Sequence, residues 1–541
     1  MSAREFPDTG QRVTPEVAAR TTRTGVGPID AGHTGHTGHT GHTGHTGHTG
    51  QTGQTGGRAR VDEGPVPDPL RLPRLLVVEG REDLRAHLAR LGPMDRAGGS
   101  AHDGPEPPRL AGLVASVEES GLVGRGGAGF STGRKLRAVA DAATKLRQPP
   151  IVVVNAMEGE PASAKDRVLL QRAPHLVVDG ATAAARAVGS LEIVVCVPHT
   201  DHTLSWAGRV PPTSRALPED ETDEDCLGWS SPHDRSVATE LATHSLQRAL
   251  AERRRAGADH IPVTVARPPE SYVSGEASAL VRWLGGGPAL PAFSVVRTAE
   301  SGVSGAPTLL DNAETFAHIA LVARYGAAWF RALGADSDPG SALVTISGAV
   351  AHPGVAEIPL GATVADLLRV AGGPTEALQA VLLGGYGGSW VPIERALAVP
   401  LGHGPAGLPL GPGIAVALPV RACGLAETAR VSRYMADEGA GQCGPCAYGL
   451  PALASALEEL AWPSAASSAS SASARVARWT GQIAGRGACG HPDGVVRMVR
   501  SAMTTFGDDV DRHAGGHGCE HSGRSPLLAV PPRRRHLDGH P

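Results

Sequence analysis

Short apolar runs alternate with amphipathic stretches over the middle of the chain, and this alternation predicts an α/β layer. Residues 149–155 form a β-branched run between turn signals, as in a buried parallel strand. Residues 167–187 have helical spacing, and residues 191–197 form a second apolar strand. A helix over 239–256 and a strand over 261–266 follow a polar, acidic interruption. Strand, helix and strand at this spacing indicate a parallel sheet covered by helices.

The pattern changes after residue 342. Residues 342–350 are strand-like, Pro353-Gly354 indicates a hairpin, and residues 362–371 have helical spacing. We therefore expect a small β-rich α+β domain here. Two mostly helical stretches follow, with a Ser/Ala linker between them: residues 424–460, 474–505 and, for the linker, 463–474.

Both ends of the chain have the composition of disordered segments. Residues 1–65 carry a His-Thr-Gly triplet that repeats from His33 through His48. Glycine recurs every third residue, but the repeat contains no proline, which excludes a collagen triple helix. A low-complexity tail that cannot form a core is one interpretation, and a metal-binding tract is the other. Residues 516–541 are rich in Pro, Arg and His.

Charge and cysteine usage exclude several classes of protein. The formal net charge of −4 argues against a nucleic-acid binder. No apolar run approaches the roughly 18–20 residues that cross a bilayer, and the N-terminal residues lack the apolar stretch of a signal peptide. We expect a cytoplasmic protein without direct membrane insertion, peripheral to a membrane only through a partner. Seven cysteines, an odd number, do not indicate a disulfide framework.

The strongest local motif is the segment 121–135, Gly-Leu-Val-Gly-Arg-Gly-Gly-Ala-Gly-Phe-Ser-Thr-Gly-Arg-Lys, with six glycines around Arg125 and Lys135. Glycine lets the backbone approach a ligand and direct N–H groups toward an anion. A helix that begins after the loop adds the positive end of its dipole. The segment therefore suits a phosphate-bearing cofactor. Its spacing matches neither a dinucleotide fingerprint directly after a strand nor a P-loop. A glycine-rich surface loop is the alternative.

Three later segments also place polar groups where a ligand can bind. Residues 155–161 follow a strand, and open α/β sheets bind ligands at the carboxyl ends of their strands. Residues 270–280 place an aromatic ring, a glycine and a carboxylate before an apolar helix. Residues 311–315 can cap a helix and offer donors to an anion. Taken alone, each has a structural alternative: a polar loop, a helix start and a plain cap.

Three cysteines suggest metal chemistry. Cys443 and Cys446 lie in a Gly/Pro turn, and Cys489 lies downstream. Thiolates this close suit an iron–sulfur cluster. A dead or remodelled cluster is the second interpretation, and zinc, with His491 beside Cys489, is the third. Free cysteines placed by chance are the remaining alternative.

These five motifs, in this order, resemble the flavin- and NADH-binding subunit of respiratory complex I and its relatives in NAD-linked hydrogenases and formate dehydrogenases. The resemblance covers roughly residues 113–505. It implies an α/β fold with three domains between disordered tails at 1–65 and 516–541. These domains are a Rossmann-like FMN-binding domain over 66–335, a β-grasp (ubiquitin-like, SLBB-type) α+β domain over 336–420 and a C-terminal helical iron–sulfur domain over 421–515.

The resemblance also assigns residues to each ligand. FMN contacts fall on Gly124, Arg125, Gly126, Gly127, Lys135, Asn155, Glu158, Tyr272, Gly275, Glu276, Asn312 and Thr315. NADH contacts fall on Phe130 and Glu160, and Glu160 is expected to orient the nicotinamide. Cluster ligands, for a 4Fe-4S centre, fall on Cys443, Cys446 and Cys489.

The chain departs from the family pattern on both sides of the flavin. Met157 stands where the family has Asp, Ala277 where it has a second Glu that helps hold NADH, and Leu290 where it has Lys. Loss of a carboxylate that hydrogen-bonds a ribose or an amide costs about 1–3 kcal/mol. Ala440 stands at the first position of the family's Cys-x-x-Cys-x-x-Cys, and Cys519 is a candidate replacement ligand.

The implied function is that of an NADH dehydrogenase subunit. NAD(P)H reduces FMN, and single electrons pass through the cluster to another electron-transfer subunit, a ferredoxin-like protein or a membrane-bound, quinone-linked partner. An electron-relay or assembly subunit that has lost nicotinamide binding is the alternative. A third hypothesis is a sugar- or cobalamin-type binding protein that works through the β-grasp domain.

Overall fold

The computed structural model describes residues 68–77, 80–94, 109–200, 232–294, 296–402, 407–464 and 466–531. All of them belong to one compact unit, residues 62–541. The tail expected over residues 1–65, with its His-Thr-Gly repeat, lies outside the described residues.

Four parallel strands form the first sheet, in the order β3-β2-β1-β4. They are Ile151–Asn155 (β1), Glu192–Cys196 (β2), Val263–Ala266 (β3) and Thr308–Asn312 (β4). Residues 152–154 of β1 are fully buried, because helices cover both faces of a parallel sheet. β1 pairs with β2 on one side and with β4 on the other, so the strand order reverses at the β1–β4 border.

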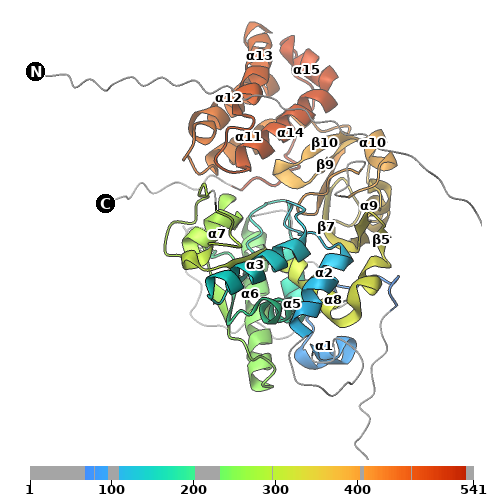
Figure 1. Cartoon of the computed structure of the whole chain (residues 1–541). Helices are drawn as coiled ribbons and strands as arrows, with labels where there is room; N and C mark the ends of the chain where they lie inside the picture. The colour runs from blue at the N-terminus through green and yellow to red at the C-terminus, as the bar shows by residue number, and fades with distance from the viewer. Residues whose placement is uncertain are drawn as a thin grey trace, which may run out of the picture. The chain divides into compact units, whose positions relative to one another are not determined.

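Helices surround this sheet (Figure 1), and α5 and α8 lie in close contact. A Cβ on Gly180 in α5 would lie 1.7 Å from the carbonyl oxygen of Phe316 in α8, so only glycine permits this packing. The single helix expected over 167–187 is two helices, because Pro174 has no N–H to continue the first. The helices are Leu84–Leu91 (α1), Arg109–Ser120 (α2), Thr132–Leu146 (α3), Lys165–Arg172 (α4), Pro174–Val188 (α5), Pro232–Arg255 (α6), Ala277–Leu284 (α7) and Ala313–Arg331 (α8).

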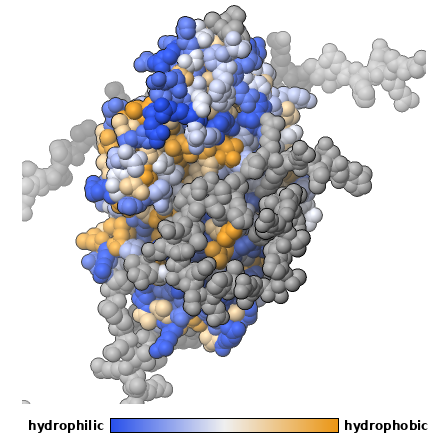
Figure 2. Space-filling view, turned by 180° about the vertical axis from the view of Figure 1, so that it is seen from behind, coloured by the Kyte–Doolittle hydropathy of each residue, from blue (hydrophilic) through white to orange (hydrophobic). Residues whose placement is uncertain are grey.

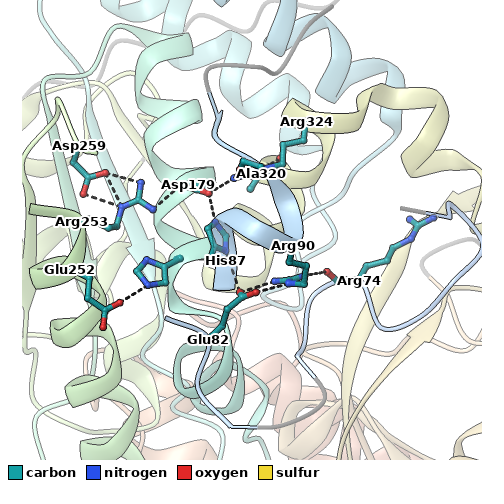
Figure 3. Close-up of polar contacts among 12 residues, drawn as sticks. Arg74, Glu82, His87, Arg90, Asp179, Glu252, Arg253, Asp259, Ala320 and Arg324 are labelled. Atoms are coloured by element: carbon teal, nitrogen blue, oxygen red, sulfur yellow. Dashed lines mark hydrogen bonds and ion pairs between the residues drawn. The ribbon is translucent and has the colours of Figure 1, made fainter. Parts of the chain in front are cut away.

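A buried network of charged side chains attaches α1 to this domain (Figure 3). The Nδ1 atom of His87 lies 3.2 Å from Glu82, and its Nε2 atom lies 2.7 Å from Asp179. Arg253 pairs with Asp179 at 2.8 Å. Burial acts to raise the pKa of Glu82, but hydrogen bonds from Arg90 and His87 outweigh it and lower that pKa to about 2. The network therefore holds ionised carboxylates inside the protein.

The second sheet has five strands in the order β10-β9-β11-β7-β8. β7 and β11, the first and last of these strands in the sequence, are neighbours and run parallel. All other neighbouring strands are antiparallel, which is the β-grasp arrangement that the sequence predicts. The hairpin expected at Pro353-Gly354 joins β7 to β8. The elements are Ser341–Gly348 (β7), Gly354–Pro359 (β8), Val364–Val370 (α9), Leu378–Leu383 (β9), Ser389–Pro392 (β10), Ile393–Ala398 (α10) and Ile414–Pro419 (β11), after a two-stranded ribbon of Gly334–Ala335 (β5) and Asp338–Pro339 (β6).

The third part is helical, as predicted (Figure 1). Its helices are Gly424–Asp437 (α11), Leu450–Ala461 (α12), Ala466–Ile483 (α13), His491–Thr505 (α14) and Gly507–Ala514 (α15). The Ser/Ala linker expected over 463–474 is wrong, because most of that segment belongs to α13. Ala469, Ala472 and Val476 are buried on one side of α13, and alanine favours the helix.

Residues 516–531, for which the composition indicates disorder, lie against the helical part. The carboxylate of Glu427 in α11 accepts hydrogen bonds from the backbone N–H groups of Leu527 (2.8 Å) and Leu528 (3.0 Å). Leu528 and Cys519 are buried. Two adjacent leucines inside a Pro- and Arg-rich tail thus supply an apolar anchor that the overall composition conceals.

Apolar side chains also remain at the surface. Seen from behind (Figure 2), hydrophobic residues form patches among hydrophilic ones. The exposed large side chains include Phe130, Phe293 and Tyr448. Among the described residues, no helix is long and apolar enough to cross a membrane.

Candidate functional site

Two asparagines mark the carboxyl edge of the parallel sheet. Asn155 at the end of β1 and Asn312 at the end of β4 are register partners, and the Asn312 side chain donates to the carbonyl oxygen of Asn155 (3.2 Å). The Asn155 side chain donates to the carbonyl oxygen of Gly275 (2.8 Å). This edge lies at the point where the strand order reverses, which is where open sheets bind ligands. The structure therefore brings three predicted flavin contacts together.

The glycine loop lies over the same edge. The backbone N–H of Gly124 donates to the carbonyl oxygen of Phe130 (2.8 Å), which closes the loop before α3. The N–H of Arg125 donates to the Oγ1 atom of Thr315 (3.0 Å) in the first turn of α8. A Cβ on Gly126 would lie 3.5 Å from the Cβ of Asn312. The loop and the N-terminus of α8 thus face one another, as an anion site requires.

Arg125 is buried beneath this loop, and its Nε, Nη1 and Nη2 atoms have no hydrogen-bond partner. Burial lowers the pKa of Arg125, and the nearby carboxylates of Glu314 and Asp338 act to raise it. A buried guanidinium without hydrogen-bond partners is unfavourable, and a phosphate group satisfies such a fork well. The arrangement fits the phosphate of FMN.

The sequence predicts that Lys135 contacts FMN. In the structure, Lys135 instead pairs with groups of the protein itself. Its Nζ atom pairs with the Asp311 carboxylate at 2.8 Å and donates to the carbonyl oxygen of Leu310 (3.0 Å). The sequence gives no signal for this pair, because 176 positions separate the two residues. The contact of Lys135 with FMN stays a prediction.

Lys165 in α4 is a residue that the sequence analysis missed. It is buried, pairs with Asp166 and Glu314 at 2.9 Å each, and donates to the Oδ1 atom of Asn312 (2.8 Å). Burial acts to lower the pKa of Lys165, but the two carboxylates raise it above its ordinary value. Burial raises the pKa of Asp166 to about 6. The helix predicted from the sequence begins at residue 167, and Lys165 carries no local signal of this role because two of its partners, Asn312 and Glu314, lie far along the chain.

Glu158 uses its carboxylate to hold the start of α4. It accepts hydrogen bonds from the Ser163 hydroxyl (2.7 Å) and from the backbone N–H groups of Asp166 (2.9 Å) and Arg167 (3.2 Å). Glu158 also has a φ of +42°, a left-handed conformation that is uncommon outside glycine. These contacts give the Glu158 carboxylate a structural role. Its contact with FMN stays a prediction.

Glu160 is buried between the first domain and the β-grasp domain. Its Oε2 atom accepts from the Tyr272 hydroxyl (3.1 Å) and from the Tyr386 N–H (3.0 Å), whereas its buried Oε1 atom has no partner. Burial raises the pKa of Glu160 to about 7. Phe130, the other predicted NADH contact, is exposed on the glycine loop. The two residues thus have very different environments.

The segment 272–276 joins the sheet edge to the helical part. The Tyr272 N–H donates to Glu438 (2.8 Å), and the Tyr272 ring packs edge-on against His491 with centroids 5.4 Å apart. Glu276 caps α7, since its carboxylate accepts from the Ser278 N–H (2.9 Å). The side chain of Glu276 also acts on the Cys489 thiol and helps to raise its pKa, although burial is the larger cause.

The three predicted cluster ligands lie together. Burial raises the pKa of Cys446 to about 12, and the neighbouring Cys443 and Cys489 thiols act in the same direction. A Cβ on Gly439 would lie 3.5 Å from the Sγ atom of Cys446, so Ala440 follows a residue that borders the site. Three thiols fit three irons of a cluster.

The prediction that Cys519 replaces the missing cysteine ligand of this cluster is wrong. Its thiol lies beside Cys423, which caps the N-terminus of α11, whereas Cys443 and Cys446 follow the C-terminus of the same helix. At 1.5 Å per residue, a helix of 14 residues is about 20 Å long. His491 lies closer to the cluster cysteines, and its Nδ1 atom is buried without a hydrogen-bond partner.

Comparisons with known proteins agree with this geometry. Family models described as the Nuo51 FMN-binding domain, the SLBB domain and the NADH-ubiquinone oxidoreductase-F iron-sulfur binding region match residues 117–207, 343–389 and 426–513. The F subunit of the NADH-quinone oxidoreductase of Streptomyces coelicolor is 30% identical over 414 residues, which are 75% of this chain and 84% of the relative. The chain belongs to the family of NADH-quinone oxidoreductase F subunits. The F subunit of Mycobacterium tuberculosis H37Rv is also 30% identical, over 77% of this chain and 88% of the relative.

A solved structure extends the likeness to the fold. The NAD+-reducing [NiFe]-hydrogenase in the H2-reduced state contains a chain that matches with a TM-score of 0.64 and 26% identity. The match covers 81% of this chain and 67% of the hydrogenase chain. The predicted family resemblance and the predicted fold class, an FMN-type α/β part, a β-grasp part and a helical part, are confirmed.

Proposed function

We propose that this chain oxidises NADH and passes the electrons through FMN and a 4Fe-4S cluster to a partner electron-transfer subunit in a quinone-reductase-like system. The observation that carries the proposal is the position of the segment 272–276. This segment contacts Asn155 at the sheet edge and also borders His491 and Cys489. A flavin at the sheet edge and a cluster on the cysteines would therefore share one wall, which suits electron transfer between them.

When bound, FMN accepts a hydride and releases single electrons, which a cluster can carry onward. The chain supplies binding and orientation. Arg125 and the N-terminus of α8 would neutralise the phosphate. Asn155 and Gly275 would hold the ring near the sheet edge. Glu160, with a pKa near 7 and one oxygen without a partner, can donate to or accept from a nicotinamide amide.

The fourth iron of the cluster needs a ligand other than cysteine, because Ala440 has no thiol. We propose the Nδ1 atom of His491 for this position. The other ring nitrogen, Nε2, lies 2.8 Å from the carbonyl oxygen of Met435, which fixes the proton on Nε2 and leaves Nδ1 free to bind metal. Burial lowers the pKa of His491, which favours the neutral, ligating form.

The cofactor content of Arg125→Gln tests the flavin site. We expect wild-type protein to purify with FMN, and we expect the variant to bind FMN at least about tenfold more weakly, because a charge-assisted pair contributes more than about 1.4 kcal/mol. Arg134→Gln, on the exposed face of α3, is the matched control and should retain FMN. Equal FMN affinity in both variants would show that Arg125 does not bind FMN. Wild-type protein that never takes up FMN would contradict the proposed function.

A further inference from the structure

Three metal-binding side chains meet at the end of α11 that lies away from the cluster cysteines. The Sγ atoms of Cys423 and Cys519 and a ring nitrogen of His513 all lie within 4.8 Å of one another. All three residues are buried. They come from the N-terminal cap of α11, from α15 and from the segment that follows α15. We infer that these residues form a zinc site that is separate from the iron–sulfur cluster.

The spacing of the ligand atoms suits one ion. Tetrahedral zinc binds sulfur at about 2.3 Å and imidazole nitrogen at about 2.0–2.1 Å, so neighbouring ligand atoms lie roughly 3.5–4 Å apart. The Sγ atom of Cys423 lies 4.0 Å from the Nε2 atom of His513. An iron–sulfur cluster would hold its cysteines farther apart, because each sulfur binds a different iron. Two thiols and one imidazole are a ligand set that zinc prefers.

The orientation of His513 supports this assignment. Its Nδ1 atom lies 3.1 Å from the carbonyl oxygen of Leu460, which can only accept, so Nδ1 carries the proton and Nε2 carries the lone pair. A second partner of this kind is typical of metal-binding histidines. In this structure Nε2 accepts the N–H of Cys519 (3.0 Å), so the lone pair points toward the segment that carries the second thiol. Zinc would take the place of that hydrogen bond.

Burial raises the pKa of Cys423, so a bound metal would have to displace the thiol proton, and one local feature favours the thiolate. Its Sγ atom caps α11 and accepts from the Ala426 N–H (3.4 Å), and a helix N-terminus stabilises negative charge. Cys423 also lines a surface cavity of about 320 Å³, which gives an ion a path from solvent. His521 lines the same cavity, and its Nδ1 atom is buried without a hydrogen-bond partner. The ring nitrogens of His521 do not belong to the group of ligand atoms that lie within 4.8 Å of one another, so water would fill the fourth position.

Such an ion would attach residues 516–531 to α11, in addition to the hydrogen bonds that Glu427 makes with Leu527 and Leu528. The site is therefore structural in character, because it closes the C-terminal segment onto the helical part. Metal binding should raise the thermal midpoint of the protein.

Cobalt titration of the full chain tests the site. Cobalt bound to thiolate absorbs through sulfur-to-metal charge transfer, whereas cobalt bound to the histidines of residues 33–48 does not. The background is Cys443→Ser/Cys446→Ser/Cys489→Ser, which removes the cluster thiols. We expect one equivalent of cobalt to give the thiolate band and zinc to displace it. Adding Cys423→Ser or Cys519→Ser should weaken binding by at least about tenfold, and adding Cys196→Ser, at a buried thiol in β2, should not.

Two results would overturn the inference. One is a folded background protein that gives no thiolate band, and the other is a Cys423–Cys519 disulfide in protein purified without reductant. If the background protein does not fold, X-ray absorption at the zinc edge of wild-type protein decides, after a weak chelator has removed exposed zinc. Sulfur neighbours at ~2.3 Å that are lost in Cys423→Ser support the site, whereas sulfur neighbours that are unchanged in that variant, or nitrogen or oxygen neighbours alone, contradict it.

Discussion

At the scale of single residues, the most informative groups are buried polar atoms without partners. Arg125 and Glu160 both carry such atoms, and both were candidates from the sequence because of the motifs around them. The sequence could not show the actual partners of Lys135 or Glu158, because Asp311 and the backbone of α4 reach them only in the folded chain. Motifs thus identified which residues gather at the site, and the structure showed which of them already have partners.

Glu160→Gln should change how stability depends on pH. Burial raises the pKa of Glu160 from 4.5 to about 7. The stability tied to its protonated form is fully present below pH 4.5 and is lost as the pH rises through about 7. The variant cannot ionise, so denaturant unfolding should show it more stable than wild type above pH 7, by up to about 3 kcal/mol, and similar to wild type near pH 4.5. A constant difference at all pH values would contradict the assigned pKa.

His491→Ala and Ala440→Cys test the fourth ligand as a pair. We expect His491→Ala to lose about one iron per cluster, since a cubane with three protein ligands readily loses one iron. Ala440→Cys should restore the fourth iron in the His491→Ala background. Iron analysis and electron paramagnetic resonance measure both effects. A full complement of four irons in His491→Ala would exclude His491 as a ligand.

At the scale of helices and strands, the sequence predicted those elements whose buried residues form a clear local pattern. The strands β1 and β2 are continuous apolar runs, and the hairpin of β7 and β8 has a clear turn, so all three patterns predicted the right structure. The first part of α13, up to residue 474, was read as a linker, because its serines favour turns and loops when read locally, whereas the rest of α13 was predicted as helix. Its buried alanines explain the helix, and α13 packs against other helices of this part.

His87→Ala should loosen α1. The substitution removes one buried hydrogen bond from each of the carboxylates of Glu82 and Asp179 (Figure 3), which keep their arginine partners, so we expect a loss of about 1–3 kcal/mol in the free energy of unfolding. The control His244→Ala lies at an exposed position of α6 and should change stability by less than about 0.5 kcal/mol. Equal losses in the two variants, measured by denaturant unfolding, would show that the network does not stabilise the protein.

At the scale of the whole molecule, the order of motifs predicted the three-part architecture, whereas the contacts between parts were beyond sequence patterns. Tyr272 meets Glu438 across 166 positions, and Glu160 meets Tyr386 across 226. No local periodicity reports such pairs. They matter because they bring the flavin-binding edge and the cluster cysteines to opposite sides of one short segment.

Anaerobic titration of the purified protein with NADH, followed by flavin absorbance, tests the proposed function most directly. We predict that the flavin bands bleach on addition of NADH and that Glu160→Gln slows the bleaching. The resemblance marks Met157, Ala277 and Leu290 as departures from the family pattern, so this measurement decides whether the chain still binds a nicotinamide. Flavin that stays oxidised with excess NADH, but bleaches with dithionite, would contradict NADH oxidation and leave an electron-relay protein that has lost its nicotinamide site.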